Sequence, residues 1–383
     1  MSKKYMEKIK ILQVVSCLEK GGTEAYIVNN FRHIDRERFS FDFLVFVEKE
    51  YPYYTDIIHN LGGRIFFCGV PSLKRIPIFL YRIISVIKKY GPYQAVHSHV
   101  NIANSWVLVA TKLAGVPIRI SHSHDTSGKD SDTFLRKAYI WWEELLIKKN
   151  ATHFLACSTL AGEYLYGKEF FAAKGIVSHN GIDIAQFIDI NENKQQALKE
   201  ELDIADHIIF GNITRFEPKK NTLFTIDVFA KIVKKYPNAV LLLGGPDGGL
   251  LENVKSRVHK LGLDGNVRFI GVRNDVPDLL HLMDVYLFPS LFEGLGIVAL
   301  EAQAAGVYII ASKAVPREVD MGLGLIEFCS LDVDQWVTAG CKHIFRKQQD
   351  RNMVIKQFRG KGYLIEESVK EIADIYEGEI GHV

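Results

Sequence analysis

The stretch VYLFPSLFEGLGIVALEAQAAGVYIIAS, residues 285–312, decides the fold. The apolar runs at its two ends predict buried strands, and the segment between them is typical of a helix. A strand, a helix and a second strand in this order predict a βαβ unit with parallel strands. The loop that carries Glu293, Gly294 and Gly296 then follows the carboxyl end of a strand and precedes a helix. Doubly wound sheets bind their ligands at such positions.

The same alternation of strand-like and helix-like segments extends along the chain. Its 383 residues suit two domains, and a content of 48% hydrophobic and 24% charged residues excludes disorder and a coiled coil. We therefore predict the α/β class with two Rossmann-like domains. The polar stretch 189–206 is the predicted boundary between residues 1–188 and residues 189–362. Strands are predicted at 9–16, 41–46, 64–69, 95–99, 118–122, 153–158, 208–214, 239–245, 267–271, 285–289 and 307–312.

The longest helical pattern of the first half, residues 132–149, has Trp141, Trp142, Leu145 and Leu146 along its apolar side. We expect these side chains to lie in the core. No apolar run reaches the roughly 18 to 20 residues that span a bilayer, and the amino terminus lacks the apolar stretch of a signal peptide. The five scattered cysteines form no disulfide framework or zinc motif. These features predict a protein kept in the reducing cytoplasm.

The net charge of +2 conceals an asymmetry between the halves of the chain. Residues 1–150 hold 22 Lys+Arg and 14 Asp+Glu, a net of +8, and the remainder carries −6. No carboxylate occurs between Asp56 and Asp125, where eight basic residues lie. We expect this stretch to face an anionic lipid surface or a pyrophosphate-bearing acceptor, with a merely solvated basic face as the alternative. Nucleic acid is not expected as a partner, because no binding motif accompanies the charge.

The element Glu293-x7-Glu301 spans the loop and the helix that follows it. A helix that begins here offers unpaired N–H groups and the positive end of its dipole to a phosphate. Gly294 and Gly296 let the backbone approach that phosphate closely. One carboxylate would reach a sugar, and the other would accept hydrogen bonds from a ribose at the far end of a diphosphate. The alternative is an ordinary loop and helix with two surface acids.

A second element, Arg215-x4-Lys220, follows the predicted strand 208–214 and precedes a helix. Arg presents a fork to phosphate oxygens, and Lys presents a point charge. Together they suit a pyrophosphate, the leaving group of a sugar nucleotide. Two cations that interact only with solvent are the alternative.

These motifs resemble those of a known family, the retaining GT-B glycosyltransferases of family 4, or glycosyl transferase group 1. The two elements above match in order, as do Gly21-Gly22-Thr23-Glu24 after the first strand and Asn180-Gly181-Ile182-Asp183. The resemblance covers nearly the whole chain and is strongest to bacterial enzymes of exopolysaccharide and capsule assembly. It implies a GT-B fold, in which two Rossmann-like domains face each other across a cleft. It also implies that a C-terminal helix, residues 363–383 here, packs back on the first domain.

The resemblance implies a role for each matching residue, and it implies no cofactor or metal. The residues are Arg215 and Lys220 for the donor diphosphate, Glu301 for the ribose, Glu293 with the backbone of Gly294, Leu295 and Gly296 for the transferred sugar and the phosphates, Gly21 and Gly22 for the diphosphate and acceptor, and Asn180 and Gly244 as further substrate-binding positions.

Four histidines, His97, His99, His122 and His124, lie on or just after two successive predicted strands. Alternation along a strand puts the members of each pair on one face. The resemblance implies that a histidine at the end of such a strand contacts the donor sugar near the reacting carbon. We expect it to be His124, with His122 as the second choice, and we expect a structural role for His97. Metal ligation is not expected, because no carboxylate shares the spacing.

The resemblance implies an activity as well. The chain would transfer a sugar, with retention, from a nucleotide-sugar donor, with a bias to UDP, to a hydroxyl of a lipid-linked oligosaccharide acceptor at the inner face of the cell membrane. The expected catalytic residues are His124, Glu293, Arg215 and Lys220. No protein nucleophile is needed. The resemblance implies a front-face mechanism in which the departing phosphate oxygen takes the acceptor's proton. The alternatives are a nucleotide-sugar 2-epimerase of the same fold and a non-catalytic assembly subunit.

Overall fold

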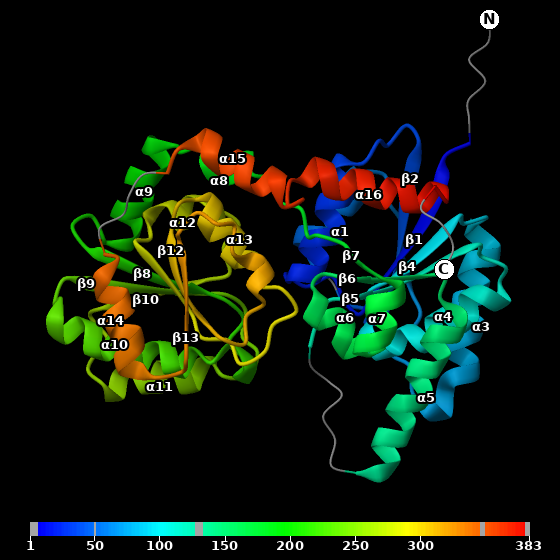
Figure 1. Ribbon diagram of the computed structural model, residues 1–383, viewed down its shortest axis with the longest axis horizontal. Coiled ribbons are helices and arrows are strands. Elements are labelled where there is room, and N and C mark those ends of the chain that lie inside the picture. Colours follow the sequence, from blue (N-terminus) through cyan, green and yellow to red (C-terminus); the bar gives the residue numbers. More distant parts are fainter. Residues whose placement is uncertain (1–6, 50, 127–132, 345–348, 380–383) are drawn as a thin grey trace, which may run out of the picture. The chain divides into compact units, whose positions relative to one another are not determined.

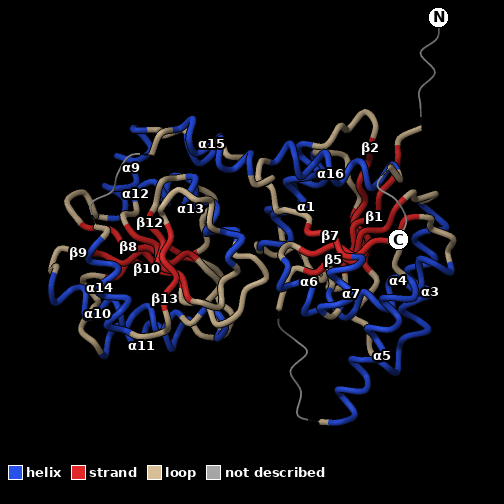
Figure 2. The backbone as a smooth tube through the Cα atoms, in the orientation of Figure 1, coloured by secondary structure: helices blue, strands red, loops and turns tan. Residues whose placement is uncertain are grey.

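The computed structural model shows the chain folded as two α/β units (Figure 1). The first unit is built from residues 1–181 together with 362–383, and the second from residues 182–361. In each unit a central sheet is covered by helices (Figure 2). The residues that the structure describes are 7–49, 51–126, 133–344 and 349–379.

The first unit contains a parallel sheet of seven strands in the order β3-β2-β1-β4-β5-β6-β7. The chain builds outward from β1 on one side and from β4 on the other, so these neighbours mark the switch point of the sheet. The strands are β1 (Ile9–Val15), β2 (Phe39–Val45), β3 (Ile65–Phe67), β4 (Ala95–Ser98), β5 (Ile118–Ser123), β6 (His153–Ala156) and β7 (Gly175–Val177). The α-helices are α1 (Gly22–His33), α2 (Pro52–Asn60), α3 (Ile76–Tyr90), α4 (Asn104–Leu113), α5 (Phe134–Asn150), α6 (Thr159–Tyr166), α7 (Lys168–Lys174) and α16 (Ile365–Glu377).

The second unit repeats the plan with six parallel strands in the order β10-β9-β8-β11-β12-β13. Its switch point lies between β8 and β11. The strands are β8 (Ile208–Ile213), β9 (Ala239–Gly244), β10 (Val267–Gly271), β11 (Val285–Phe288), β12 (Tyr308–Ser312) and β13 (Ile326–Cys329). The α-helices are α8 (Ala185–Ile188), α9 (Glu192–Leu202), α10 (Thr222–Lys235), α11 (Leu251–Lys260), α12 (Val276–Leu282), α13 (Ile297–Ala304), α14 (Val333–Lys342) and α15 (Arg351–Gly360).

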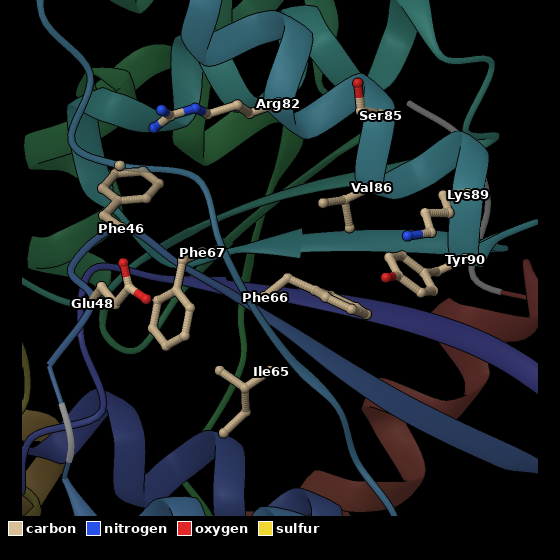
Figure 3. Close-up of a pocket in the computed structure, with 11 residues that line it drawn as sticks. Phe46, Glu48, Ile65, Phe66, Phe67, Arg82, Ser85, Val86, Lys89 and Tyr90 are labelled. Carbon is tan, nitrogen blue, oxygen red and sulfur yellow. The ribbon is translucent and has the colours of Figure 1, made fainter.

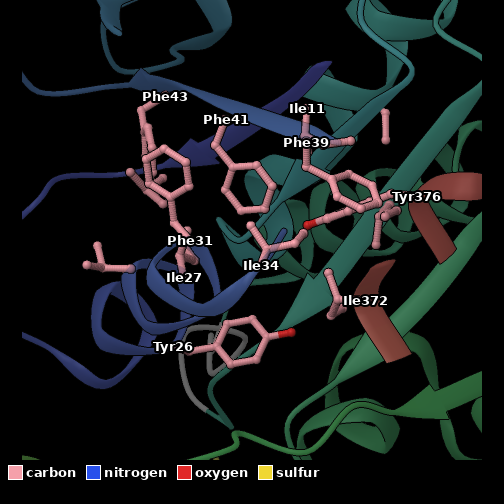
Figure 4. Close-up of a cluster of buried hydrophobic side chains, with 14 of the residues drawn as sticks. Ile11, Tyr26, Ile27, Phe31, Ile34, Phe39, Phe41, Phe43, Ile372 and Tyr376 are labelled. Carbon is pink, nitrogen blue, oxygen red and sulfur yellow. The ribbon is translucent and has the colours of Figure 1, made fainter. Parts of the chain in front are cut away.

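Alternation along the buried strands divides the core of the first unit between the two faces of its sheet. Ile11 and Val15 of β1 pack with residues of α1, α2 and α16, whereas Leu12 and Val14 pack with residues of α3 and α4. Figure 4 shows the first of these clusters, in which Tyr376 of α16 lies among aromatic side chains of β2 and α1. The C-terminal helix is thus an integral part of this core.

The predicted strands are confirmed, with ends that shift by at most two residues. Two strands were missed, β7 and β13. Each is only three or four residues long and forms an edge of its sheet. So short a segment has too few residues to display an alternating pattern.

The division between the units lies at residue 181 rather than at the predicted 188. Helix α8 contacts α12 and α13, which joins residues 182–188 to the second unit. The polar stretch 189–206 is no linker, because it contains α9, which is capped by the side chain of Asn191. Leu198 is the sole fully buried residue of α9, so its sequence has the polar character of a linker.

The expectation for the apolar side of α5 is wrong. Trp141, Trp142 and Leu145 are 62%, 41% and 42% exposed, and Leu146 is only partly buried. The α5 core contact is made instead by Ile140, Glu143 and Ile147, among other residues.

Among the described residues, no helix is long and apolar enough to cross a bilayer.

Candidate active site

In the second unit, the two sequence elements predicted to bind a donor meet at the switch point of the sheet. The Arg215-x4-Lys220 element follows β8, and Glu293 follows the neighbouring strand β11. The Lys220 ammonium lies 2.5 Å from Glu293 Oε1. The two loops are also joined by their backbones, since Leu291 N–H donates to the carbonyl of Lys219 at 2.7 Å. Residues 73 positions apart in the sequence thus form one site.

Glu293 is a buried carboxylate whose charge is compensated within the site. It is 8% exposed, and Oε1 accepts a hydrogen bond from Ser290 Oγ at 2.7 Å in addition to its ion pair with Lys220. The carbonyl of Ser290 in turn accepts a hydrogen bond from Ser312 Oγ. A buried charge is tolerated only when it is paired and hydrogen-bonded in this way. These contacts fix the loop that precedes α13.

Gly296 starts α13 in a conformation that other residues rarely adopt. Its φ is +92°, and a Cβ atom there would lie 2.8 Å from the ring of Phe288. The turn directs the N-terminus of α13 to the edge of the sheet where Lys220 and Glu293 lie. Leu295 is 3% exposed, so its side chain belongs to the core and only its backbone is suited to a ligand.

Glu301 lies in α13, one residue after the buried Leu300. Burial raises the pKa of its carboxyl group to about 7. Among the described residues no group donates a hydrogen bond to this carboxylate. A carboxylate in that state is suited to accept hydrogen bonds from a ligand.

The glycine-rich loop after β9 packs against the Arg215 loop. The carbonyl of Gly244 accepts a hydrogen bond from Thr214 N–H at 2.7 Å. Gly245 has a φ of +133°, and a Cβ atom there would lie 1.9 Å from the carbonyl oxygen of Thr214. The two loops therefore touch along their backbones, which requires glycine. The structure thus gives Gly244 a contact with the Arg215 loop, and its predicted contact with substrate stays a prediction.

In the first unit, the Gly21-Gly22 turn and the four histidines lie at the same edge of the sheet. Gly21 caps α1, and Tyr26 of that helix has its ring centroid 5.2 Å from His122 and 5.5 Å from His124. The helix that begins at the Gly21-Gly22 turn therefore contacts the predicted sugar-contacting histidines through Tyr26.

Asn180 follows β7 and is 4% exposed, and its Oδ1 has no hydrogen-bond partner among the described residues. The next residue, Gly181, packs against α16, where a Cβ atom would lie 2.7 Å from the side chain of Ser368. A packing role therefore explains the glycine of this motif. The predicted contact of Asn180 with substrate stays a prediction.

The histidines form one hydrogen-bonded network with two residues that the sequence analysis did not single out, Gln13 and Tyr376. Gln13 Nε2 donates to Tyr376 Oη at 2.9 Å, and Gln13 Oε1 lies 2.9 Å from His99 Nε2. The remaining contacts are His99 Nδ1 to His124 Nε2 at 2.8 Å, His97 Nδ1 to Tyr376 Oη at 2.8 Å, and His97 Nε2 to His122 Nδ1 at 3.0 Å.

The network dictates which histidine nitrogens carry protons. Burial lowers the pKa of all four histidines, that of His124 to about 3, so each ring is neutral and has one N–H. Gln13 Oε1 must accept from His99, so His99 Nδ1 accepts from His124 Nε2. His124 Nδ1 is then a free acceptor, and it has no partner among the described residues. The network therefore presents a buried acceptor at the predicted sugar-contacting residue.

Three of the histidines also lie close enough together to bind a metal ion. One nitrogen from each of His97, His99 and His122 lies within 4.8 Å of the others, which is compatible with a metal ion. Both nitrogens of His97 and of His99 already take part in the hydrogen bonds above. A metal would have to displace them, and the expectation that none is required stays a prediction.

The first unit also has a hollow of about 620 Å³ between β3 and α3 (Figure 3). Phe66, Phe67 and Tyr90 line it together with Arg82 and Lys89. None of the site residues predicted from the sequence lies there.

Comparison with known proteins establishes the family. The model for glycosyl transferases group 1 matches residues 193–321, and the model for glycosyltransferase family 4 matches residues 20–186. The chain belongs to the GT-B glycosyltransferases of family 4. The predicted family, fold class and enzyme class are thereby confirmed.

Three similar proteins illustrate the relationship. EpsF of Bacillus subtilis (strain 168), whose name describes it as a glycosyltransferase, is 30% identical over 96% of each chain. A UDP-Gal:alpha-D-GlcNAc-diphosphoundecaprenol alpha-1,3-galactosyltransferase of Escherichia coli is 28% identical over 96% of this chain and 97% of its own. The crystal structure of Anabaena HepE in complex with UDP-glucose superposes with a TM-score of 0.79 at 18% identity, over 97% of this chain and 100% of that one. This last likeness is one of fold.

The histidine network predicts that Tyr376 stabilises the first unit through its hydroxyl group. Tyr376→Phe leaves Gln13 Nε2 and His97 Nδ1 buried without a hydrogen-bond partner, so we expect the free energy of unfolding to fall by about 1–3 kcal/mol. Chemical denaturation, monitored by circular dichroism, measures the free energy of unfolding of each variant. Tyr81→Phe is the matched control, because Tyr81 is 71% exposed. Equal stability of the two variants would show that the network contributes nothing.

Proposed function

We propose that this glycosyltransferase moves a sugar, with retention, from a UDP-linked donor to a hydroxyl of a lipid-linked glycan acceptor in polysaccharide assembly. The observation that carries the proposal is the Lys220–Glu293 pair at the switch point of the second unit, beside the N-terminus of α13. The name of the Escherichia coli relative, which specifies a UDP-linked donor and a diphosphoundecaprenol acceptor, supports both substrate classes.

The donor diphosphate would be held by the Arg215 and Lys220 cations together with the N-terminus of α13. Charge placed on the leaving group in this way stabilises the transition state, in which negative charge grows on the phosphate as the bond to the anomeric carbon breaks. The carboxylate of Glu301 would accept hydrogen bonds from the ribose hydroxyls. Glu293, held by Ser290 and Lys220, would orient the transferred sugar.

The acceptor hydroxyl would attack the anomeric carbon from the face that the diphosphate leaves, which retains the configuration. The acceptor hydroxyl is itself the nucleophile on that face, so no protein nucleophile is required, and the departing phosphate oxygen takes its proton. His124 would accept a hydrogen bond from a sugar hydroxyl at Nδ1, the nitrogen that the network keeps unprotonated. Glu293 is a positioning group here, in contrast to the carboxylate pair of glycosidases.

The proposed diphosphate site predicts that replacing two adjacent lysines, Lys219 and Lys220, has very different effects on the affinity for UDP. Lys220→Met removes the cation that faces Glu293, so we expect UDP to bind about 10- to 100-fold more weakly, as the loss of a charge-assisted hydrogen bond implies. Lys219→Met is the matched control, because the Lys219 ammonium lies 3.6 Å from Glu217, whereas the Lys220 ammonium faces Glu293. Isothermal titration calorimetry gives both dissociation constants. Similar affinities for UDP in the two variants would contradict the assignment.

The raised pKa of Glu301 predicts a pH dependence of donor binding. The carboxyl is protonated in the folded protein below about pH 7 and ionised above it, and only the ionised form accepts two ribose hydrogen bonds. The affinity for UDP-glucose, whose diphosphate does not titrate near neutrality, should therefore rise as the pH increases from 6 to 8. Glu301→Gln should abolish this dependence. A slope that persists in Glu301→Gln would assign the effect to another group.

The raised pKa of Glu301 also predicts that the stability of the protein depends on pH. Between about pH 4.5 and 7 the folded state keeps a proton on Glu301 that the unfolded state has lost. The free energy of unfolding should therefore fall as the pH rises through this window, relative to Glu301→Gln. Denaturation of both proteins at pH 5 and pH 7.5 tests the difference.

We also propose that the basic N-terminal part of the chain attaches the enzyme to an anionic membrane, where a lipid-linked acceptor resides. Lys74, Arg75, Lys88 and Lys89 are exposed, and no carboxylate lies between residues 57 and 124. Basic residues near such a surface contribute about 1 kcal/mol each.

Charge reversal tests this attachment. Lys88→Glu/Lys89→Glu should weaken binding to phosphatidylglycerol vesicles at least about tenfold, since two attractive contributions become repulsive. Lys234→Glu/Lys235→Glu is the matched control, because this exposed pair lies in the last turn of α10, as Lys88 and Lys89 lie in the last turn of α3. Vesicle co-sedimentation measures both. An equal loss in the two variants would mean that net charge alone governs binding.

A further inference from the structure

The outward face of α5 carries large apolar side chains that stay exposed in the part of the chain that the structure describes. Trp141 is 62% exposed, Trp142 41% and Leu145 42%. The helix projects from the edge of the first unit, with its C-terminal end nearer α4 (Figure 1). Proteins rarely expose several large apolar residues together unless the patch binds something. We call Trp141, Trp142 and Leu145 the α5 patch.

The aromatic residues around the patch are held in a fixed arrangement by one buried carboxylate. Glu143 is 3% exposed, and it accepts hydrogen bonds from Trp106 Nε1 at 3.0 Å and from the Tyr139 hydroxyl. Burial raises the pKa of this carboxyl group. The Trp142 ring packs edge-on against Trp106, with centroids 5.2 Å apart. The polar groups of the cluster are therefore satisfied on the inner side, which leaves apolar surface outside.

Exposed apolar side chains also occur on the two neighbouring helices. Helix α4 contacts α5 on one side and α3 on the other. Tyr81 of α3 is 71% exposed and Leu113 of α4 is 68% exposed. The three helices together carry eight basic residues and two acidic ones, of which Glu143 is buried. The basic residues are Arg82, Lys88, Lys89, Lys112, Arg136, Lys137, Lys148 and Lys149.

This combination selects an anionic bilayer over a second copy of the chain. A symmetric self-contact would bring like patches together and place cations against cations, which is destabilising. An anionic lipid surface instead neutralises the cations, while its interfacial zone accommodates Trp and Leu side chains. We propose that the α5 patch inserts Trp141 and Leu145 into the interface of an anionic membrane. The inference rests on the proposed lipid-linked acceptor and adds an apolar anchor to the electrostatic attachment.

The tryptophans of the chain make insertion directly measurable. Of its four tryptophans, Trp336 is fully buried and Trp106 is partly buried, so changes in emission on adding lipid report chiefly on Trp141 and Trp142. We expect a blue shift with vesicles of mixed phosphatidylglycerol and phosphatidylcholine, and quenching when the acyl chains are brominated. Pure phosphatidylcholine vesicles should give neither effect.

A matched pair of variants tests the anchor. Leu145→Glu should weaken vesicle binding at least about tenfold, because a leucine that would be buried becomes a charge. Leu261→Glu is the control, since Leu261 is 38% exposed and lies in the second unit. Trp141→Gln should likewise reduce both affinity and the blue shift. Circular dichroism checks that each variant is folded.

Two results would overturn the inference. The first is Leu145→Glu binding vesicles as tightly as Leu261→Glu. The second is a concentration-dependent dimer, seen by light scattering, that Leu145→Glu disrupts. Transfer to a water-soluble acceptor, assayed in parallel, separates this question from the enzymatic one. Leu145→Glu should leave the rate of transfer to the soluble acceptor unchanged. If the wild-type protein shows no such transfer, the proposed function is refuted but the membrane anchor is not.

Discussion

The ion pair between Lys220 and Glu293 is the interaction on which the second unit's site depends. The pair forms because β8 and β11 are neighbours at the switch point of the sheet, where the strand order reverses. The loops that follow these two strands therefore lie side by side at one edge of the sheet. A carboxylate that is 8% exposed would be costly without its cation and Ser290. The pair fixes the loop that ends at Gly296 and with it the N-terminus of α13. A diphosphate placed there would meet cations and helix amides together.

The first unit uses neutral polar groups in the corresponding place. Its switch-point strands β1 and β4 supply Gln13, His97 and the adjacent His99, and β5 leads to His124. Burial keeps the histidines uncharged, so the network acts through tautomers rather than through charge. Tyr376 joins it from the far end of the sequence, which makes the C-terminal helix α16 part of the site's framework as well as of the core. A chain without α16 would leave Gln13 Nε2 and His97 Nδ1 without their hydrogen-bond partner Tyr376.

Much of this was predictable from local patterns, and the reasons for the failures are physical. Apolar periodicity locates strands and helices, and a motif at the carboxyl end of a strand locates a loop at the ligand-binding edge. Periodicity does not reveal what covers an apolar face, so it predicts Trp141 in the core, although this side chain is 62% exposed. Nor does it connect Gln13 with Tyr376, 363 positions away. A lone Gln inside the apolar strand 9–16 was the available signal, because a buried amide requires partners.

The most direct test of the central claim is a double-mutant cycle on the ion pair, with the free energy of UDP binding as the measured quantity. The variants are Lys220→Met, Glu293→Gln and their combination. If the pair builds the diphosphate site, the two substitutions are strongly non-additive, with a coupling of about 1–3 kcal/mol. Additive effects, or UDP affinity that none of the three variants changes, would contradict the account.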